Sequence, residues 1–270
     1  MRTKLSNTEA ALVAVCAVFS ALALFGPPLN QPAGYHGFAD QRMLLGIPNA
    51  MDVLSNLPFA LAGMLGLYCL WSMPPRILSN VQRAMAALFF AGLVLTAAGS
   101  AWYHWQPDDF GLAADRSGMA VAFAGALGLA AAGRVSARAG AVLGLLVLLL
   151  APFTIQAWTA TGNLLPWAVL QFGGVALLLW LALLRPRYWA LEIRWGIMIV
   201  AYAAAKLLEI NDAQVFLLTH EIVSGHTLKH LMAALAAWPV LAAVFALRVS
   251  RQNAPGRILS RGSARHATEA

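Results

Sequence analysis

Long apolar stretches alternate with short polar breaks along most of the chain. Reading the apolar runs against the Gly, Pro and charged breaks predicts eight helices. A helix needs roughly 20 mainly apolar residues to cross the hydrocarbon core of a membrane, and most of these runs approach that length. The predicted helices run from Ala10 to Phe25, Asp52 to Trp71, Arg83 to His104, Asp115 to Ala132, Ala137 to Gln156, Leu164 to Leu184, Trp195 to Glu209 and His226 to Leu247.

The composition excludes an ordinary soluble domain. Of the 270 residues, 60% are hydrophobic and 11% are charged, whereas about 25% are charged in an average soluble domain. We therefore expect an all-α protein, a polytopic bundle of transmembrane helices. Cys16 and Cys69 lie in apolar runs without a spacing motif, so they indicate neither a disulfide framework nor a thiolate metal site.

The formal charge of +7 is better explained by membrane orientation than by nucleic-acid binding, because the basic residues stand singly between apolar runs. If the N-terminus is inside, eight crossings return the C-terminus to the inside, and most Lys and Arg residues fall on that side. The exceptions are Arg42, Arg116, Lys206 and Lys229. The sequence predicts a protein of the bacterial inner membrane with cytoplasmic termini, and it indicates no obligate protein partner.

The chain divides into three predicted parts. Residues 1–30 hold the first transmembrane helix, 31–248 form the helical core, and 249–270 form a basic cytoplasmic tail that we expect to be disordered. The basic start of the first helix and its Ala21-Leu22-Ala23 stretch also fit a cleaved signal peptide. Loss of that segment would leave seven helices in the same orientation.

Three histidines carry the candidate chemistry. His226 and His230 are four residues apart, which places both imidazoles on one side of a helix. The predicted topology brings His104, at the outer end of the third helix, to the same membrane face. Three protein ligands with an open fourth position for water are typical of catalytic zinc, whereas four protein ligands close a structural zinc site. The sequence therefore predicts a zinc site towards the outer face.

Two further polar residues lie at the same predicted face. Asp115 starts the fourth helix, and a carboxylate there can accept a proton from a zinc-bound water. Ser100 shares a helix face with His104 and can donate a hydrogen bond to a developing oxyanion. These roles predict metal-assisted hydrolysis of an amide or ester. In the alternative interpretation, Asp115 only stabilises the start of its helix and Ser100 only packs between helices.

At these residues the chain resembles the alkaline ceramidase family, part of a membrane hydrolase superfamily that also contains the adiponectin receptors. The family pattern is a serine and a histidine four apart, an aspartate eleven residues later, and a late pair of histidines four apart. The segment from Asn49 to Asn56 is also similar to the start of the family's seven-helix core. The resemblance covers roughly residues 40–247, and the pattern matches Ser100, His104, Asp115, His226 and His230.

The resemblance implies a seven-helix hydrolase core preceded by one extra helix. It also implies a Zn2+ ion held by the three histidines, Asp115 as proton carrier, Ser100 as oxyanion partner, and a substrate that is a ceramide-like or other N-acyl lipid with an acyl chain. Only Asp40, Asn49 and Asp52 stand where animal members carry an acidic calcium site. The resemblance therefore gives little support for calcium dependence.

Two other classes of function remain open at this point. In a receptor or lipid-sensing protein, the zinc would be mainly structural. In a transporter, the histidines would relay protons, and polar residues would continue through the middle of several helices.

One more polar group remains near the outer end of the predicted seventh helix. Lys206, Glu209 and Asp212 lie three residues apart there, and we expect a structural ion-paired strip. Lys229 is expected to reach the membrane interface or to pair with Glu221 or Asp212.

Overall fold

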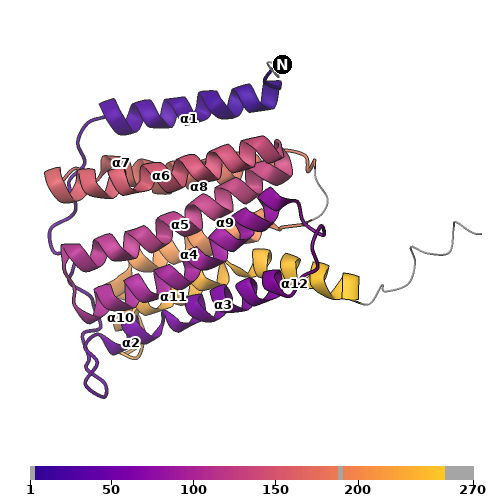
Figure 1. Cartoon of the computed structure of the whole chain (residues 1–270). Coiled ribbons are helices and arrows are strands. Elements are labelled where there is room, and N and C mark those ends of the chain that lie inside the picture. Colours follow the sequence, from indigo (N-terminus) through magenta and orange to yellow (C-terminus); the bar gives the residue numbers. More distant parts are fainter. Residues whose placement is uncertain (1–3, 188–190, 253–270) are drawn as a thin grey trace, which may run out of the picture.

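The computed structural model describes residues 4–187 and 191–252. These residues fold into a bundle of helices that lie roughly side by side (Figure 1). The described part contains no strand, so the predicted all-α class is confirmed. The elements are α1 (Asn7–Phe25), α2 (Ala50–Leu54), α3 (Leu57–Trp71), α4 (Asn80–Trp105), α5 (Asp109–Arg134), α6 (Ala137–Thr161), α7 (Leu165–Ala168), the π-helix η1 (Val169–Gly173), α8 (Gly174–Leu183), α9 (Trp195–Ile210), α10 (Asp212–Leu218), α11 (Gly225–Leu235) and α12 (Trp238–Gln252).

Within the described residues, seven helical stretches are long and apolar enough to cross a membrane. They match the eight predicted helices except the one at 195–209, which is present as α9 but has only 16 residues. At 1.5 Å per residue, α9 is about 24 Å long, which is shorter than the roughly 30 Å hydrocarbon core.

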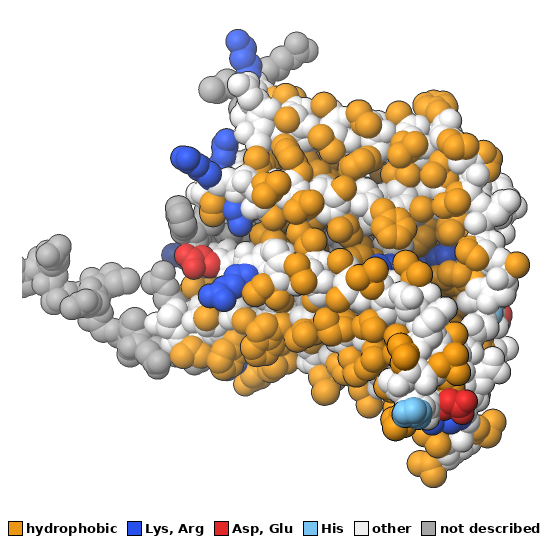
Figure 2. Space-filling view, turned by 180° about the vertical axis from the view of Figure 1, so that it is seen from behind, with side chains coloured by type: hydrophobic (Ala, Val, Ile, Leu, Met, Phe, Trp, Pro, Cys, Tyr) orange, Lys and Arg blue, Asp and Glu red, His pale blue; other side chains and the backbone are white. Residues whose placement is uncertain are grey.

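The two described ends of the chain lie at the same end of the bundle (Figure 1). The start of α1 and the end of α12 are there, whereas the short helices α2 and α10 lie at the opposite end. This placement agrees with the predicted even number of passes. Lys and Arg side chains gather at the end of the bundle where α1 starts, and hydrophobic side chains cover the walls between the two ends (Figure 2).

Glycines bring α4 and α5 into close contact. A Cβ atom on Gly92 would lie 2.2 Å from the backbone nitrogen of Ala122, and one on Gly99 would lie 2.7 Å from the carbonyl oxygen of Ala114. No larger side chain fits there unless the helices separate. Because Gly99 precedes Ser100 and Ala114 precedes Asp115, this contact places the backbones of the two candidate residues side by side.

Helix α1 lies at the edge of the bundle, as expected for an added helix (Figure 1). Only 11% of its apolar stretch is buried against the rest of the protein. Its start is held by Glu9, whose carboxylate accepts hydrogen bonds from Ser136 Oγ at 2.7 Å and Arg138 Nη2 at 2.9 Å. At the other terminus α12 continues to Gln252, so the predicted tail begins as helix. Residues 253–270 of that tail lie outside the described residues.

The segment between α1 and α2 is held against α5 by Arg116. This guanidinium is buried, lies 3.9 Å from the ring centroid of Trp158, and donates a hydrogen bond to Gln31 Oε1 at 2.9 Å. Stacking on an aromatic face offsets part of the cost of burying a cation. The contact fixes the start of the segment that covers the histidine end of the bundle.

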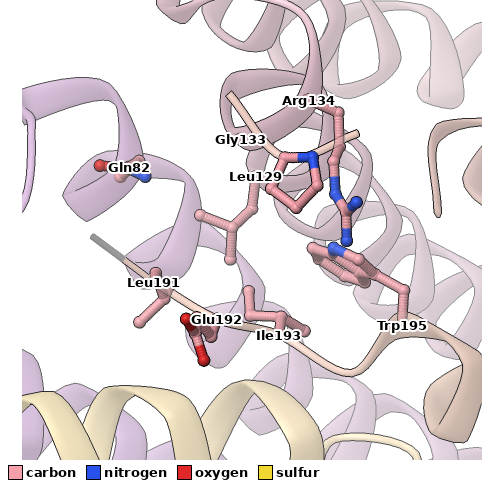
Figure 3. Close-up of a pocket in the computed structure, with 9 residues that line it drawn as sticks. Gln82, Leu129, Gly133, Arg134, Leu191, Glu192, Ile193 and Trp195 are labelled. Carbon is pink, nitrogen blue, oxygen red and sulfur yellow. The ribbon is translucent and has the colours of Figure 1, made fainter. Parts of the chain in front are cut away.

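A cavity of about 210 Å³ opens at the end of the bundle that carries the termini (Figure 3). Gln82 of α4 and Arg134 of α5 are among its lining residues. Gln82 precedes His104 by 22 residues along one helix, a rise of roughly 33 Å. This cavity is therefore too far from the histidines to hold a substrate that reacts there.

Candidate metal centre

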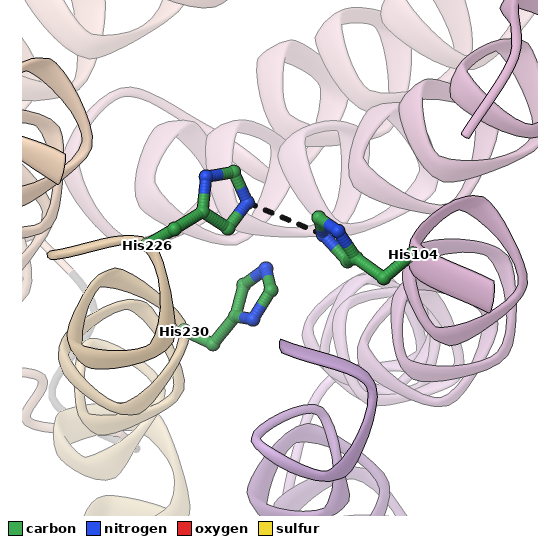
Figure 4. A group of neighbouring side chains, drawn as sticks. All are labelled: His104, His226 and His230. Atoms are coloured by element: carbon green, nitrogen blue, oxygen red, sulfur yellow. Dashed lines mark hydrogen bonds between the residues drawn. The ribbon is translucent and has the colours of Figure 1, made fainter. Parts of the chain in front are cut away.

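The structure brings the three predicted histidines together (Figure 4). His104 comes from the last turn of α4, and His226 and His230 come from the first two turns of α11. Nε2 of His104 lies 3.2 Å from Nε2 of His226, and one ligand atom from each residue lies within 4.8 Å of the others. All three side chains are buried.

Capping contacts fix where α11 begins and therefore how its histidines point. Ser224 is the N-cap residue, and its Oγ accepts a hydrogen bond from the backbone nitrogen of Thr227 at 3.0 Å. Asp212 accepts the backbone N–H of His226 through Oδ1 at 2.7 Å, and it accepts the N–H of Ala39 through Oδ2 at 2.9 Å. A carboxylate at this position also interacts favourably with the positive end of the helix dipole. Asp212 thus joins the covering segment to the helix that carries two histidines.

The orientation of His230 is set by a serine on the loop between α2 and α3. Ser55 Oγ donates a hydrogen bond to the backbone carbonyl of Asp52 at 3.0 Å. Because its own proton is used there, the same oxygen accepts a hydrogen bond from Nδ1–H of His230 at 2.8 Å. A proton on Nδ1 leaves the lone pair on Nε2, which is the nitrogen that faces the other histidines. The contact therefore holds His230 in the tautomer that can bind a metal.

Asp52 holds α2 against α11. Its Oδ1 accepts a hydrogen bond from Thr227 Oγ1 at 2.6 Å, and its backbone carbonyl oxygen accepts one from Ser55 Oγ. The side chain is fully buried, and Oδ2 has no partner among the residues that the structure describes. One residue thus connects the short helix α2 with both Ser55 and the first turn of α11.

This donor set fits a zinc ion. Ligand nitrogens at 2.0–2.1 Å from a tetrahedral zinc lie about 3.3 Å apart, close to the 3.2 Å between His104 and His226. Over the described residues, no fourth His, Cys, Asp or Glu joins the group. Three imidazoles without a fourth protein ligand leave one coordination position open, as in catalytic zinc sites.

Ser100 and Asp115 lie on the inner side of the histidines, one turn or more into the bundle. Ser100 Oγ is 3.5 Å from Nε2 of His230, the nitrogen available to a metal. Asp115 is buried, yet within the described residues it makes no hydrogen bond or ion pair. Within the described residues, no hydrogen bond or ion pair joins it to the histidines. The structure therefore brings Ser100 to the centre and leaves the Asp115 carboxylate unengaged on the facing helix.

An aromatic layer closes the histidine cluster on the outer side. The ring of Phe38 lies 4.5 Å from that of His104 and 4.8 Å from that of His226, measured between centroids. Tyr103 packs edge-on against Phe38, and its hydroxyl bonds Nδ1 of His36 at 3.0 Å. Aromatic rings thus cover one side of the centre, and Ser100 lies on the other.

The three residues considered for calcium are each engaged elsewhere. Arg42 binds both carboxylate oxygens of Asp40, at 2.8 Å and 2.6 Å. Burial alone would raise the pKa of Asp40, but the hydrogen bonds and charge of Arg42 lower it below its ordinary value. Asn49 donates to the carbonyl of His104 at 2.8 Å, and Asp52 accepts from Thr227. These contacts account for Asp40 and Asn49, whereas Oδ2 of Asp52 has no partner among the described residues.

The expected ion-paired strip is only partly correct. Lys206 pairs with Glu209, with 2.5 Å between Nζ and Oε2, but Asp212 binds backbone N–H groups instead. The expected pairing of Lys229 with Glu221 or Asp212 is wrong. Its Nζ lies 2.8 Å from Oε1 of Glu209, because α9 packs directly against α11.

Sequence patterns missed four residues that shape the centre: Ser55, Asn49, Asp212 and Phe38. Both Ser55 and Asn49 lie in the segment from Asn49 to Asn56, which gave Ser55 no role and marked Asn49 only as a calcium candidate. Asp212 was assigned to an ion-paired strip. A small polar cluster at the start of an apolar helix is a weak signal for Ser55, and nothing in the sequence marks Phe38.

No protein-family model matches the chain, and no curated protein matches it.

Replacing Ser55 with alanine is expected to weaken zinc binding by roughly 10- to 100-fold, because His230 loses the partner that fixes its tautomer. Ser55→Thr keeps the hydroxyl and should recover most of the affinity. Chelator competition on the purified protein measures both variants. Equal zinc affinity in Ser55→Ala and the unmodified protein would show that the contact does not orient a ligand.

Proposed function

We propose that the protein is a zinc-dependent membrane hydrolase that cleaves the amide bond of a ceramide-like or other N-acyl lipid. The observation that carries the proposal is a buried group of three histidines with no fourth protein ligand among the described residues, beside an unengaged carboxylate. A purely structural site would be closed by a fourth ligand. The resemblance of the same five residues to the alkaline ceramidase pattern points to the same chemistry.

His104, His226 and His230 would hold the ion through their Nε2 atoms. A zinc ion bound there supplies Lewis-acid activation of a water molecule and of the amide carbonyl. Asp115 accepts a proton from the attacking water and delivers it to the amide nitrogen as the C–N bond breaks. Ser100 donates its hydroxyl proton in a hydrogen bond to the carbonyl oxygen as negative charge develops. The products are a fatty acid and a free amine.

The acyl chain has an apolar surface available beside His230. A groove of about 290 Å³ between α3 and α11–α12 is lined by Pro58, Ala62, Leu231, Ala234, Leu235, Trp238 and Leu241. Because Leu231 follows His230, a chain in this groove begins close to the reacting carbonyl.

The site lies at the opposite end of the bundle from both termini (Figure 1). We propose that the end with the termini faces the cytoplasm of a bacterial cell, because Lys and Arg gather there. The metal centre then faces the outer side of the inner membrane.

Metal removal tests the proposal directly. We expect the purified protein to contain about one zinc per chain, to lose hydrolysis of a fluorescent ceramide when a chelator removes the zinc, and to recover it on zinc addition. A protein that binds zinc but cleaves no acyl amide would instead support the receptor or lipid-sensing interpretation. A protein that binds no zinc would contradict both.

A further inference from the structure

Two lysines share one carboxylate beside the metal centre. Nζ of Lys229 lies 2.8 Å from Glu209 Oε1, and Nζ of Lys206 lies 2.5 Å from Glu209 Oε2. Lys229 sits on α11 directly before His230, and the other two residues are on α9. Their side chains remain 18–25% accessible. The group is therefore inside the bundle but still open to a small ligand.

Two ammonium groups share the contacts of a single carboxylate here. Charges within membrane helices are costly and are normally paired. Glu209 neutralises one lysine, and the other nearby acids are engaged elsewhere or form no ion pair. Asp52 accepts a hydrogen bond from Thr227, and Asp212 accepts hydrogen bonds from two backbone N–H groups. Asp115 forms no ion pair within the described part of the chain. Asp115 also acts electrostatically on both lysines, but among the described residues Glu209 is the carboxylate that contacts them.

Unused hydrogen-bond donors point in the same direction. An ammonium group has three donors, and within the described residues each of these lysines makes one side-chain hydrogen bond, to Glu209. Donors left without acceptors away from bulk water cost free energy. An anionic oxygen group is a ligand that can accept hydrogen bonds from these donors.

One side of α11 beside the histidines carries a lysine and the other side is apolar, and this difference would orient a substrate. At about 100° per residue, Lys229 lies on one side of the direction shared by His226 and His230. Leu231 and Ala234, which line the apolar groove, lie on the other side. An acyl chain in the groove would place the carbonyl at the histidines and the substituent on nitrogen towards the lysines.

We propose that Lys206 and Lys229 bind a carboxylate carried next to the scissile amide, so that the preferred substrate is an N-acyl amino acid. This inference rests on the proposed function and names its substrate class. Hydrolysis breaks the C–N bond, the oxygen of water joins the acyl carbon, and its proton goes to the amide nitrogen. The products are a fatty acid and an amino acid, and no further co-reactant is needed.

The test compares N-palmitoylglycine with the uncharged N-palmitoylethanolamine. The zinc-loaded protein is expected to show kcat/KM roughly tenfold or more higher for the anionic amide, the range of a charge-assisted hydrogen bond. Lys206→Gln and Lys229→Gln should each bring the ratio close to one, mainly through KM. Each substitution leaves Glu209 with a single lysine, so the remaining pair is neutral. Lys4→Gln, at the exposed N-terminal end, is the matched control and should keep the ratio.

Titration calorimetry with zinc-depleted protein separates this inference from the proposed function. N-palmitoylglycine should bind the unmodified protein more tightly than N-palmitoylethanolamine, and either Lys→Gln change should remove the difference. If no amide is cleaved but this binding pattern is present, the lysine site stands and the hydrolase proposal fails. If ceramide is cleaved while both lysine variants keep the original binding and kcat/KM ratios, the lysine proposal is overturned.

Discussion

Replacing His230 with alanine is expected to remove tight zinc binding and amide hydrolysis together. The substitution leaves only His104 and His226 to hold the ion, which are two nitrogen ligands instead of three. Loss of a partner that only orients a ligand commonly costs 10- to 100-fold in metal affinity, so loss of the ligand itself should cost at least about 100-fold. Elemental analysis and chelator competition on detergent-purified protein measure the effect.

His220→Asn is the matched control for this experiment. His220 is exposed, it precedes α11, and its φ of 54° is one that asparagine tolerates. The control should keep the zinc content and activity of the unmodified protein. A His230→Ala protein that binds zinc with unchanged affinity would mean that the three histidines do not form the metal site.

Asp115→Asn is expected to separate metal binding from chemistry. Asparagine keeps the shape of the side chain but cannot accept a proton, and general acid–base catalysis typically contributes 10²- to 10⁴-fold. We therefore expect kcat for the N-acyl lipid to fall by roughly that factor while zinc content stays at about one per chain. Asp115 makes no hydrogen bond or ion pair with the described residues, so the melting temperature should change little.

The control for this change is Asp109→Asn at the start of the same helix. Asp109 is an exposed carboxylate that contacts His36, and its replacement should leave kcat near the unmodified value. If Asp115→Asn keeps full kcat, another group carries the proton, and the role assigned to Asp115 is wrong. If it loses zinc, the carboxylate supports the metal centre rather than the reaction.

The two substitutions also distinguish a hydrolase from a receptor with structural zinc. His230→Ala removes zinc in either case. Only in a hydrolase does Asp115→Asn abolish turnover in a protein that retains its metal. For a lipid that the unmodified protein cleaves, the pair therefore assigns the centre to catalysis or to structure.

Local information in the sequence predicted the helices and the three histidines. Apolar run length depends on nearby residues alone, so each predicted helix has a counterpart in the structure, with boundaries shifted by capping. Helix α5, for example, begins at Asp109 rather than Asp115, because the side chain of Asp108 accepts the N–H of Gly111 at 2.6 Å. The four-residue spacing of His226 and His230 fixes a shared face in any α-helix. Alternating passes then bring His104 to the same end.

The tertiary structure decided how each helix is rotated and which distant side chains meet. Ser55 reaches His230 across 175 residues, and Glu209 reaches Lys229 across 20. Apolar run length says nothing about rotation around a helix axis, because nearly every face of these helices is apolar. Rotation depends instead on close packing, such as the contact between Gly99 and Ala114. The sequence by itself therefore determined which ligands are available and at which end, and packing determined their orientation and neighbours.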